Sequence, residues 1–177
     1  MDSLGQLEES IALLERTPAA LDALLRGLPD GWVLRNEGAG TWSVFEVIGH
    51  LVHTERANWM LRVRMILEVG PGRAFEPLDR TPTAGESLGG LLSEFARLRT
   101  ENLAELRGLN LRAEQLALTG LHPAFGEVTL AQLLSAWAVH DLTHLTQISR
   151  VMAFQHLDAV GPWKEYLGVL HRRGKLD

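Results

Sequence analysis

The sequence predicts an all-α protein, a four-helix bundle with long connections and a short C-terminal helical tail. Four long segments repeat apolar residues at helical spacing, and no segment shows the alternating pattern of a strand convincingly. Helices that lack a sheet bury their apolar stripes against one another, which implies a bundle. The length of 177 residues favours a single domain, and we assign residues 1–177 to it.

The first two predicted helices are defined by their ends and by a proline. The first covers residues 3–26, and Pro18 should kink or interrupt it because proline lacks the N–H that a helix interior requires. The second begins at Ser43, since Ser43 with Glu46 three residues later forms a capping box. It ends at the Gly-Pro-Gly run of residues 70–72.

The third predicted helix covers roughly residues 86–106, and the fourth covers residues 129–154 with a threonine as its cap. The connections 27–41 and 108–128 are longer than the roughly two to eight residues usual in bundles, which indicates long crossings or functional loops at one end. A Gly-Pro pair at residues 161–162 opens the tail. One more packed turn is expected there from Trp163, Tyr166, Leu167 and Leu170.

Composition excludes several kinds of function. There are no cysteines, so disulfides, thiolate metal sites and a cysteine nucleophile are ruled out. A net charge of −5 without any basic block argues against nucleic-acid binding. The N-terminus has no signal-peptide pattern, and no apolar run reaches the roughly 18 residues of a membrane span. We expect a cytoplasmic protein that binds neither nucleic acid nor membrane.

Two histidines in the last predicted helix carry the main functional signal. His140 and His144 are four residues apart and lie on one helical face. That face continues through Leu133, Trp137 and Val151, so both imidazoles should point into the core. A buried imidazole must satisfy two ring nitrogens, and a metal ion would do so for both histidines. The alternative is a pair of hydrogen-bonded core histidines, because such spacing also arises by chance.

A third histidine in the second predicted helix strengthens the metal hypothesis. His50 shares a face with Val47 and Thr54, which indicates that it also points inward. Helical bundles build metal sites from side chains on facing helices. Three histidine ligands leave a coordination position for water or substrate, as catalytic sites do and closed structural sites do not. The candidate metal ligands are therefore His50, His140 and His144.

The sequence resembles the DinB-like metalloenzyme family in three features. The first is the Trp-Ser-x-x-Glu-Val-x-x-His-Leu run at residues 42–51. The second is His-x-x-x-His at residues 140–144, followed by Gln-Ile at 147–148. The third is the order of the four helices, including the Gly-Glu-Val-Thr-Leu entry at residues 126–130. The resemblance covers nearly the whole chain, and it implies that the family's three metal ligands fall on the three candidate histidines.

Polar residues beside these motifs are weaker candidates. His53, one turn along the second helix, could be a group behind the ligands or could bind substrate, although a partly exposed helix histidine is the commoner case. Gln147 could orient His144 through a hydrogen bond or could fill the core. Asp141 lies about 100° around the helix from His140, so we expect a carboxylate at the helix surface or at an interface.

The remaining charged and aromatic residues are expected to be structural. Glu46 is explained by its part in the cap. A solvated helix face is predicted for Glu55, Arg56, Arg62 and Arg64. Apolar anchors and solvated or capping histidines are predicted for Trp42, Trp137, His122 and His156.

Three neutral imidazoles would leave the charge of a divalent ion uncompensated, so the ion would lower the pKa of a bound water or thiol. Imidazole ligands suit zinc, nickel and iron alike. Two reactions on a small-molecule substrate follow: hydrolysis, and transfer of a low-molecular-weight bacterial thiol to an electrophile. The family resemblance favours transfer, because some members are similar to S-transferases that use such thiols. The alternative is a non-enzymatic metal-binding module in stress or interaction.

Apolar residues cover more than one face of the second and fourth helices. Outside the histidine face, the fourth helix carries Leu130, Leu134, Ala138, Leu142, Leu145 and Met152. A helix that is apolar nearly all round is buried on all sides, whereas a helix in a four-helix bundle normally exposes one side. A partner chain is therefore expected, and we predict a symmetric homodimer.

Overall fold

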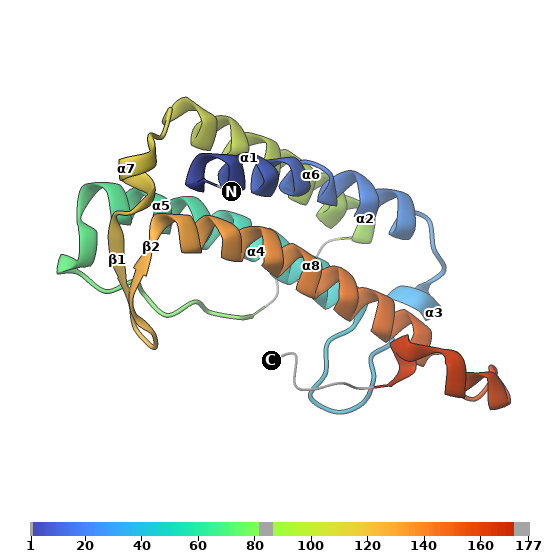
Figure 1. Cartoon of the computed structure of the whole chain (residues 1–177). Helices are drawn as coiled ribbons and strands as arrows, with labels where there is room; N and C mark the ends of the chain where they lie inside the picture. Colours follow the sequence, from blue (N-terminus) through green and yellow to red (C-terminus); the bar gives the residue numbers. More distant parts are fainter. Residues whose placement is uncertain (1, 82–86, 172–177) are drawn as a thin grey trace.

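The computed structural model describes residues 2–81 and 87–171, and its long helices form the predicted bundle (Figure 1). Four rods run along the molecule, and two of them are broken helices. The rods are α1 (Ser3–Leu14) with α2 (Thr17–Leu25), α4 (Val44–Ala57) with α5 (Trp59–Glu68), α6 (Leu88–Gly108), and α8 (Leu130–Phe154). α1 packs on α8, α4 packs on both α6 and α8, and α2 packs on α6, which closes the bundle.

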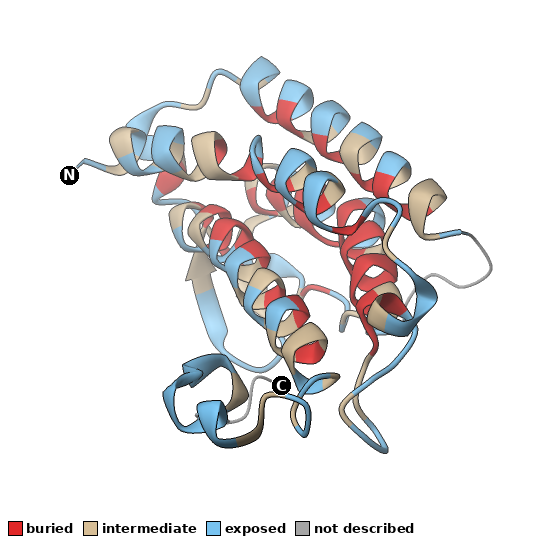
Figure 2. Cartoon of the chain, turned by 90° about the vertical axis from the view of Figure 1, so that its right-hand side faces the viewer, coloured by how far each residue is buried: buried red, intermediate tan, exposed pale blue. Residues whose placement is uncertain are grey.

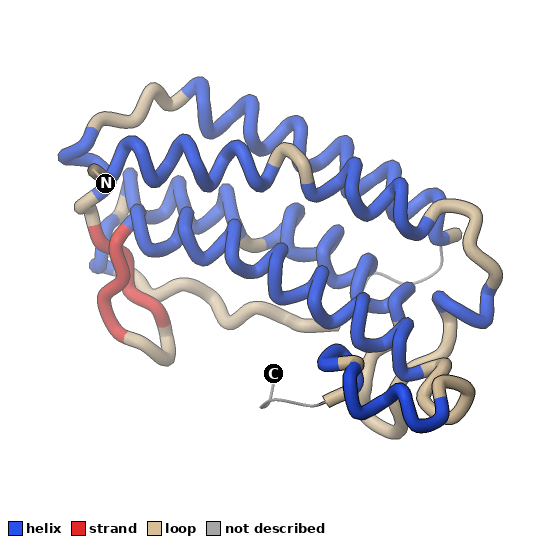
Figure 3. The backbone as a smooth tube through the Cα atoms, turned by 45° about the vertical axis from the view of Figure 1, so that its right-hand side comes forward, coloured by secondary structure: helices blue, strands red, loops and turns tan. Residues whose placement is uncertain are grey.

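Short elements occupy the connections between the rods. They are α3 (Asp30–Val33), η1 (Gly70–Gly72), α7 (Ala113–Leu116), β1 (Thr119–His122), β2 (Gly126–Thr129), η2 (Gly161–Tyr166) and η3 (Gly168–Leu170). The strands and the C-terminal 3-10 turns lie at opposite ends of the bundle (Figure 3). Among the described residues, no helix is both long enough and apolar enough to cross a membrane.

The predicted helix ends and the first break are confirmed. Ser43 and Thr129 cap α4 and α8, each through a capping box. The first rod breaks between α1 and α2, and Pro18 lies in the first turn of α2. A proline is tolerated there because the first N–H groups of a helix have no partner inside it. The sequence therefore predicted this interruption correctly.

A second break, at Asn58, was not predicted. Asn58 has φ −124° and ψ −69°, outside the helical region, and it separates α4 from α5. The break changes which side chains face inward. Leu61, which a continuous helix would place on the face of His50, is 46% exposed, whereas Trp59 is buried.

A small β-hairpin lies in the connection that was predicted to be a loop before the fourth helix, so the expectation that the chain has no strand was wrong. β1 pairs with β2 in antiparallel register, with Thr119 opposite Thr129 and His122 opposite Gly126. Gly120 is required in β1, since a Cβ there would lie 2.6 Å from the ring of Phe75. The hairpin thus closes over the end of the core between α5 and α8.

Two apolar clusters fill the core, one towards the hairpin and one towards the tail. Buried residues lie on the faces that the rods turn towards one another (Figure 2). Between the two clusters, at mid-length, each rod contributes a buried polar side chain to a layer that crosses the bundle. These residues are Thr17, Glu55, Arg99 and Asp141.

Two expectations, a packed C-terminal turn and an apolar outer face on α8, are met only in part. The tail forms 3-10 turns as predicted, but Trp163 and Tyr166 are 70% and 84% exposed instead of packed. On α8, Leu130, Leu134 and Ala138 are buried within the chain, so they do not require a partner. Val139 and Leu142 do remain exposed, and the homodimer stays a prediction.

Candidate metal centre

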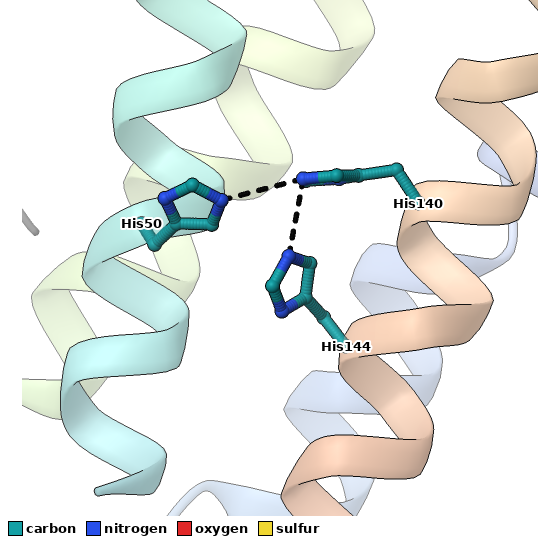
Figure 4. A group of neighbouring side chains, drawn as sticks. All are labelled: His50, His140 and His144. Carbon is teal, nitrogen blue, oxygen red and sulfur yellow. Dashed lines mark hydrogen bonds between the residues drawn. The ribbon is translucent and has the colours of Figure 1, made fainter. Parts of the chain in front are cut away.

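The cap of α4 sets the position of His50. Ser43 Oγ accepts a hydrogen bond from the Glu46 N–H at 3.3 Å, and Glu46 Oε2 accepts one from the Ser43 N–H at 2.7 Å. With the first turn fixed in this way, His50 lies about two turns into α4. Its side chain is 4% exposed and points across to α8 (Figure 4).

α8 supplies the other two histidines. Thr129 Oγ1 accepts from the Gln132 N–H at 3.1 Å, and Gln132 Oε1 accepts from the Thr129 N–H at 2.8 Å, so the helix begins at a defined residue. His140 and His144 follow on consecutive turns, and both face α4 (Figure 4). His144 is buried and His140 is partly buried.

The three imidazoles converge through their Nε2 atoms. Nε2 of His140 lies 3.3 Å from Nε2 of His50 and 3.1 Å from Nε2 of His144. The three candidate ligand atoms all lie within 4.8 Å of one another. The structure therefore brings together the three histidines that the sequence singled out.

All three histidines are held in the neutral form that binds metals. Burial lowers the pKa of His50 to about 4, and repulsion from His144 and His53 adds to this effect. Burial lowers the pKa of His140 to about 2, with further contributions from His144, His50 and Arg99. Burial also lowers the pKa of His144, while the hydrogen bond that His144 donates to Gln147 and the charge of Asp141 act in the opposite direction.

The hydrogen-bonding capacity of the cluster fits a metal ion. A ring nitrogen carries either one N–H or one lone pair, so Nε2 of His140 cannot form a full hydrogen bond with both of the other imidazoles. Within residues 2–81 and 87–171, Nδ1 of His140 is also buried without a partner. An ion would take a lone pair from each Nε2, which no proton arrangement can match.

Gln147 contacts the cluster, whereas His53 lies beside it. Gln147 Oε1 is 2.8 Å from Nδ1 of His144. Because a carbonyl oxygen only accepts, Nδ1 of His144 carries the proton and its Nε2 presents a lone pair. His53 lies one turn further along α4 and is half-buried. It is not part of the three-histidine group.

Tryptophan rings form walls of the cluster. The ring of Trp42 lies 4.9 Å from the ring of His50. The ring of Trp59 meets that of His140 edge-on at 5.2 Å and stacks on Trp137 at 5.7 Å. Sequence periodicity missed Trp59 because it assumed a continuous helix through Asn58.

Two carboxylates predicted at the surface are buried instead, which corrects those expectations. Asp141 is 1% exposed and Glu55 is 3% exposed. Their partner is Arg99 of α6, which is 1% exposed and was not among the candidate residues predicted from the sequence. Burial lowers the pKa of Arg99, but attraction to Glu55 and Asp141 outweighs it, and the pKa is raised.

Hydrogen bonds join these residues into one unit, here called the Arg99 cluster (Glu55, Arg99, Asn102, Trp137 and Asp141). Arg99 Nη1 donates to Asp141 Oδ2 at 2.7 Å, and Nη2 donates to Asp141 Oδ1 at 3.0 Å and to Glu55 Oε1 at 2.8 Å. Trp137 Nε1 donates to Glu55 Oε1 at 2.9 Å, and Asn102 donates to Glu55 Oε2 at 2.9 Å. The Arg99 cluster thereby links α4, α6 and α8.

A signal for this cluster was present in the sequence. Arg99 lies four residues after Phe95 and four before Leu103, on the apolar stripe of its helix. Asp141 occupies the same kind of position on α8, seven residues before Ile148. Charged residues of opposite sign on apolar stripes of different helices would have indicated a buried ion pair.

The fold and the histidine cluster define a helical-bundle protein of the kind that places a metal between two helices. The DinB superfamily model matches residues 13–148, and the chain belongs to this superfamily. A comparison with curated proteins finds no match.

Solved structures support the same assignment. The chain is similar to YfiT from Bacillus subtilis, described as a probable metal-dependent hydrolase with an unusual four-helix bundle topology. The identity is 25% over 81% of this chain and 86% of YfiT, with a TM-score of 0.66. The chain is also similar to TT2238, a four-helix bundle protein, with 26% identity over 78% of this chain and 94% of that protein, and a TM-score of 0.50.

Proposed function

We propose that this protein is a divalent-metal-dependent enzyme that holds one ion with His50, His140 and His144. The observation that carries the proposal is the convergence of three neutral imidazole nitrogens on one point, without enough hydrogen-bond partners among themselves. The similarity to YfiT, a probable metal-dependent hydrolase, supports it. The ion is zinc, nickel or iron, since imidazole ligands suit all three.

A divalent ion bound by three imidazoles supplies a Lewis acid that lowers the pKa of a coordinated water or thiol. The chain's own residues hold and shield it. Gln147 fixes the protonation of His144, and the rings of Trp42 and Trp59 limit water around the imidazoles. With three protein ligands, a coordination position remains for a small molecule.

As the reaction we propose transfer of a low-molecular-weight thiol to an electrophilic substrate. The chain has no cysteine, so thiol chemistry would use an exogenous thiol, and thiolate is the reactive form. The resemblance to the DinB-like family favours this reaction, because some members of that family are similar to S-transferases. We place it in the cytoplasm, where small thiols are kept reduced.

Hydrolysis is the second candidate, and the likeness to YfiT favours it specifically. The metal-loaded protein should be assayed with an activated electrophile, with and without bacterial thiols. Turnover that needs a thiol and is lost in His50→Ala supports transfer. Equal turnover without thiol supports hydrolysis. Failure of fully loaded protein to turn over any member of a broad panel would favour a metal-binding module.

A further inference from the structure

Arg99 is the one described side chain of the polar layer whose polar contacts reach three other rods. Its guanidinium donates to Asp141 of α8, to Glu55 of α4 and, at 2.8 Å, to the carbonyl oxygen of Leu14 at the end of α1. Its own backbone belongs to α6. The guanidinium of Arg99 thus connects all four rods near the middle of their length.

The same contacts involve the two helices that carry the candidate metal ligands. Asp141 directly follows His140 in α8 and precedes His144 by less than a turn. Glu55 lies in α4, little more than one turn after His50. Displacement of α4 along or away from α8 would therefore break the Arg99 contacts and separate the imidazoles together.

Glu55 is held from two further sides. Trp137, one turn before Asp141, donates from α8 to Glu55 Oε1, and Asn102 donates from α6 to both the carboxylate and the backbone oxygen of Glu55. Ligands of a site must be held to within about 0.5 Å of the productive geometry. A network of short, directed bonds on both sides of Glu55 meets that demand better than apolar packing.

We propose that the Arg99 cluster is the positioning unit of the metal site, which sets α4 against α8 so that His50 meets His140 and His144. The inference rests on the proposed metal site. Stability alone does not explain the cluster, because apolar replacement of a buried ion pair is often neutral or stabilising. Arg99, Glu55 and Asp141 are positioning residues, since they act through α4 and α8 and are not among the three candidate ligands.

The test compares two carboxylate-to-amide substitutions in arginine pairs that involve α8. Asp141→Asn weakens the Arg99 pair. Glu37→Gln weakens the pair between Glu37 and Arg150, which is also bidentate and largely buried but lies towards the tail. For each variant, zinc affinity is measured by competition with a chromophoric chelator, and the site geometry by the absorption spectrum of bound cobalt(II).

We expect Asp141→Asn to lower zinc affinity about 10- to 100-fold and to change the cobalt spectrum, as loss of groups behind metal ligands does. Glu37→Gln should leave both unchanged. If Asp141→Asn does not fold, Glu55→Gln, which keeps an acceptor for Trp137, is measured in its place. Wild-type zinc affinity in a folded variant would overturn the positioning role.

Arg99→Lys tests whether the geometry of the arginine matters apart from its charge. Lysine keeps the net charge of the cluster, but its ammonium group cannot donate to three rods as the planar guanidinium does. A loss of affinity in Arg99→Lys supports positioning, and an unchanged affinity there contradicts it even if Asp141→Asn binds weakly. Failure of the wild-type protein to bind any divalent ion would overturn the metal site itself. Normal binding by the wild type and all variants would overturn only the positioning role.

Discussion

The histidine cluster (His50, His140 and His144) and the Arg99 cluster are two groups of polar side chains inside the same bundle. They differ in how far their hydrogen-bonding atoms find partners within the chain. The Arg99 cluster combines charged side chains with the neutral donors Asn102 and Trp137, and its side-chain donors and acceptors, apart from Arg99 Nε, find partners within the chain. The histidine cluster consists of neutral bases whose Nε2 atoms face one another and whose outer nitrogens are only partly satisfied. A buried polar group whose hydrogen bonds are all formed within the chain is explained by a role in the structure, whereas buried groups that lack such partners indicate that the site binds a ligand.

The largest expected difference between the clusters is in metal binding. His144→Ala removes one of three ligands, so metal occupancy should fall sharply while helical content stays near that of the wild type. Elemental analysis and circular dichroism measure the two quantities. His122→Ala, a histidine on the hairpin, is the control and should keep its metal. Equal metal occupancy in His144→Ala and His122→Ala would contradict the assignment of His144 as a metal ligand.

Stability should depend most on the Arg99 cluster. Arg99→Leu leaves two buried carboxylates without a cation, and we expect the free energy of unfolding to fall by about 3–5 kcal/mol in urea denaturation. Arg97→Leu is the matched control two residues away on α6, where the exposed Arg97 pairs with Glu94 and Glu101. Its loss should stay below about 1 kcal/mol. Similar losses for both would show that the Arg99 pair is not buried as described.

A smaller effect is expected from pH on the metal-free protein. The folded pKa values of His50 and His140, about 4 and about 2, lie below the usual 6.5 of the unfolded chain. Below pH 6.5 the unfolded chain therefore binds more protons than the folded one, so stability falls as the pH falls. Two such groups lower the free energy of unfolding by on the order of 1 to 2 kcal/mol between about pH 7.5 and about pH 6.

Urea denaturation across this pH range checks the sign and the source of the effect. The double variant His50→Gln, His140→Gln should show a weaker dependence, because the side-chain amide does not titrate. A stability that stays constant in the wild type, or that rises towards acid pH, would mean that the imidazoles are not buried neutral groups.

Substitutions on the outer face of α8 are expected to have the smallest effect on the two clusters. If the predicted homodimer forms through Val139 and Leu142, Leu142→Glu should give monomers in sedimentation velocity and leave metal binding unchanged. Leu24→Glu on α2 is the control, since the two leucines are 43% and 44% exposed. A wild-type protein that sediments as a monomer at micromolar concentration would contradict the dimer.

The sequence predicted what depends on local pattern. Capping residues located the starts of α4 and α8, and helical spacing placed the three histidines inside the bundle. The break at Asn58 could not be predicted, because no proline or glycine marks it and tertiary packing decides it. The hairpin strands are four residues long, too short for a period-2 signal. The partners in the Arg99 cluster come from helices distant in sequence, so their pairing required the arrangement of the rods.

Metal analysis of protein purified without a polyhistidine tag tests the central claim most directly. After incubation with a divalent ion and removal of the excess, the wild-type chain should retain about one ion, and the His50→Ala, His140→Ala, His144→Ala triple variant should retain none. Circular dichroism confirms that the variant is folded. A wild-type chain that retains no ion, or a triple variant that retains as much as the wild type, would contradict the assignment of the site.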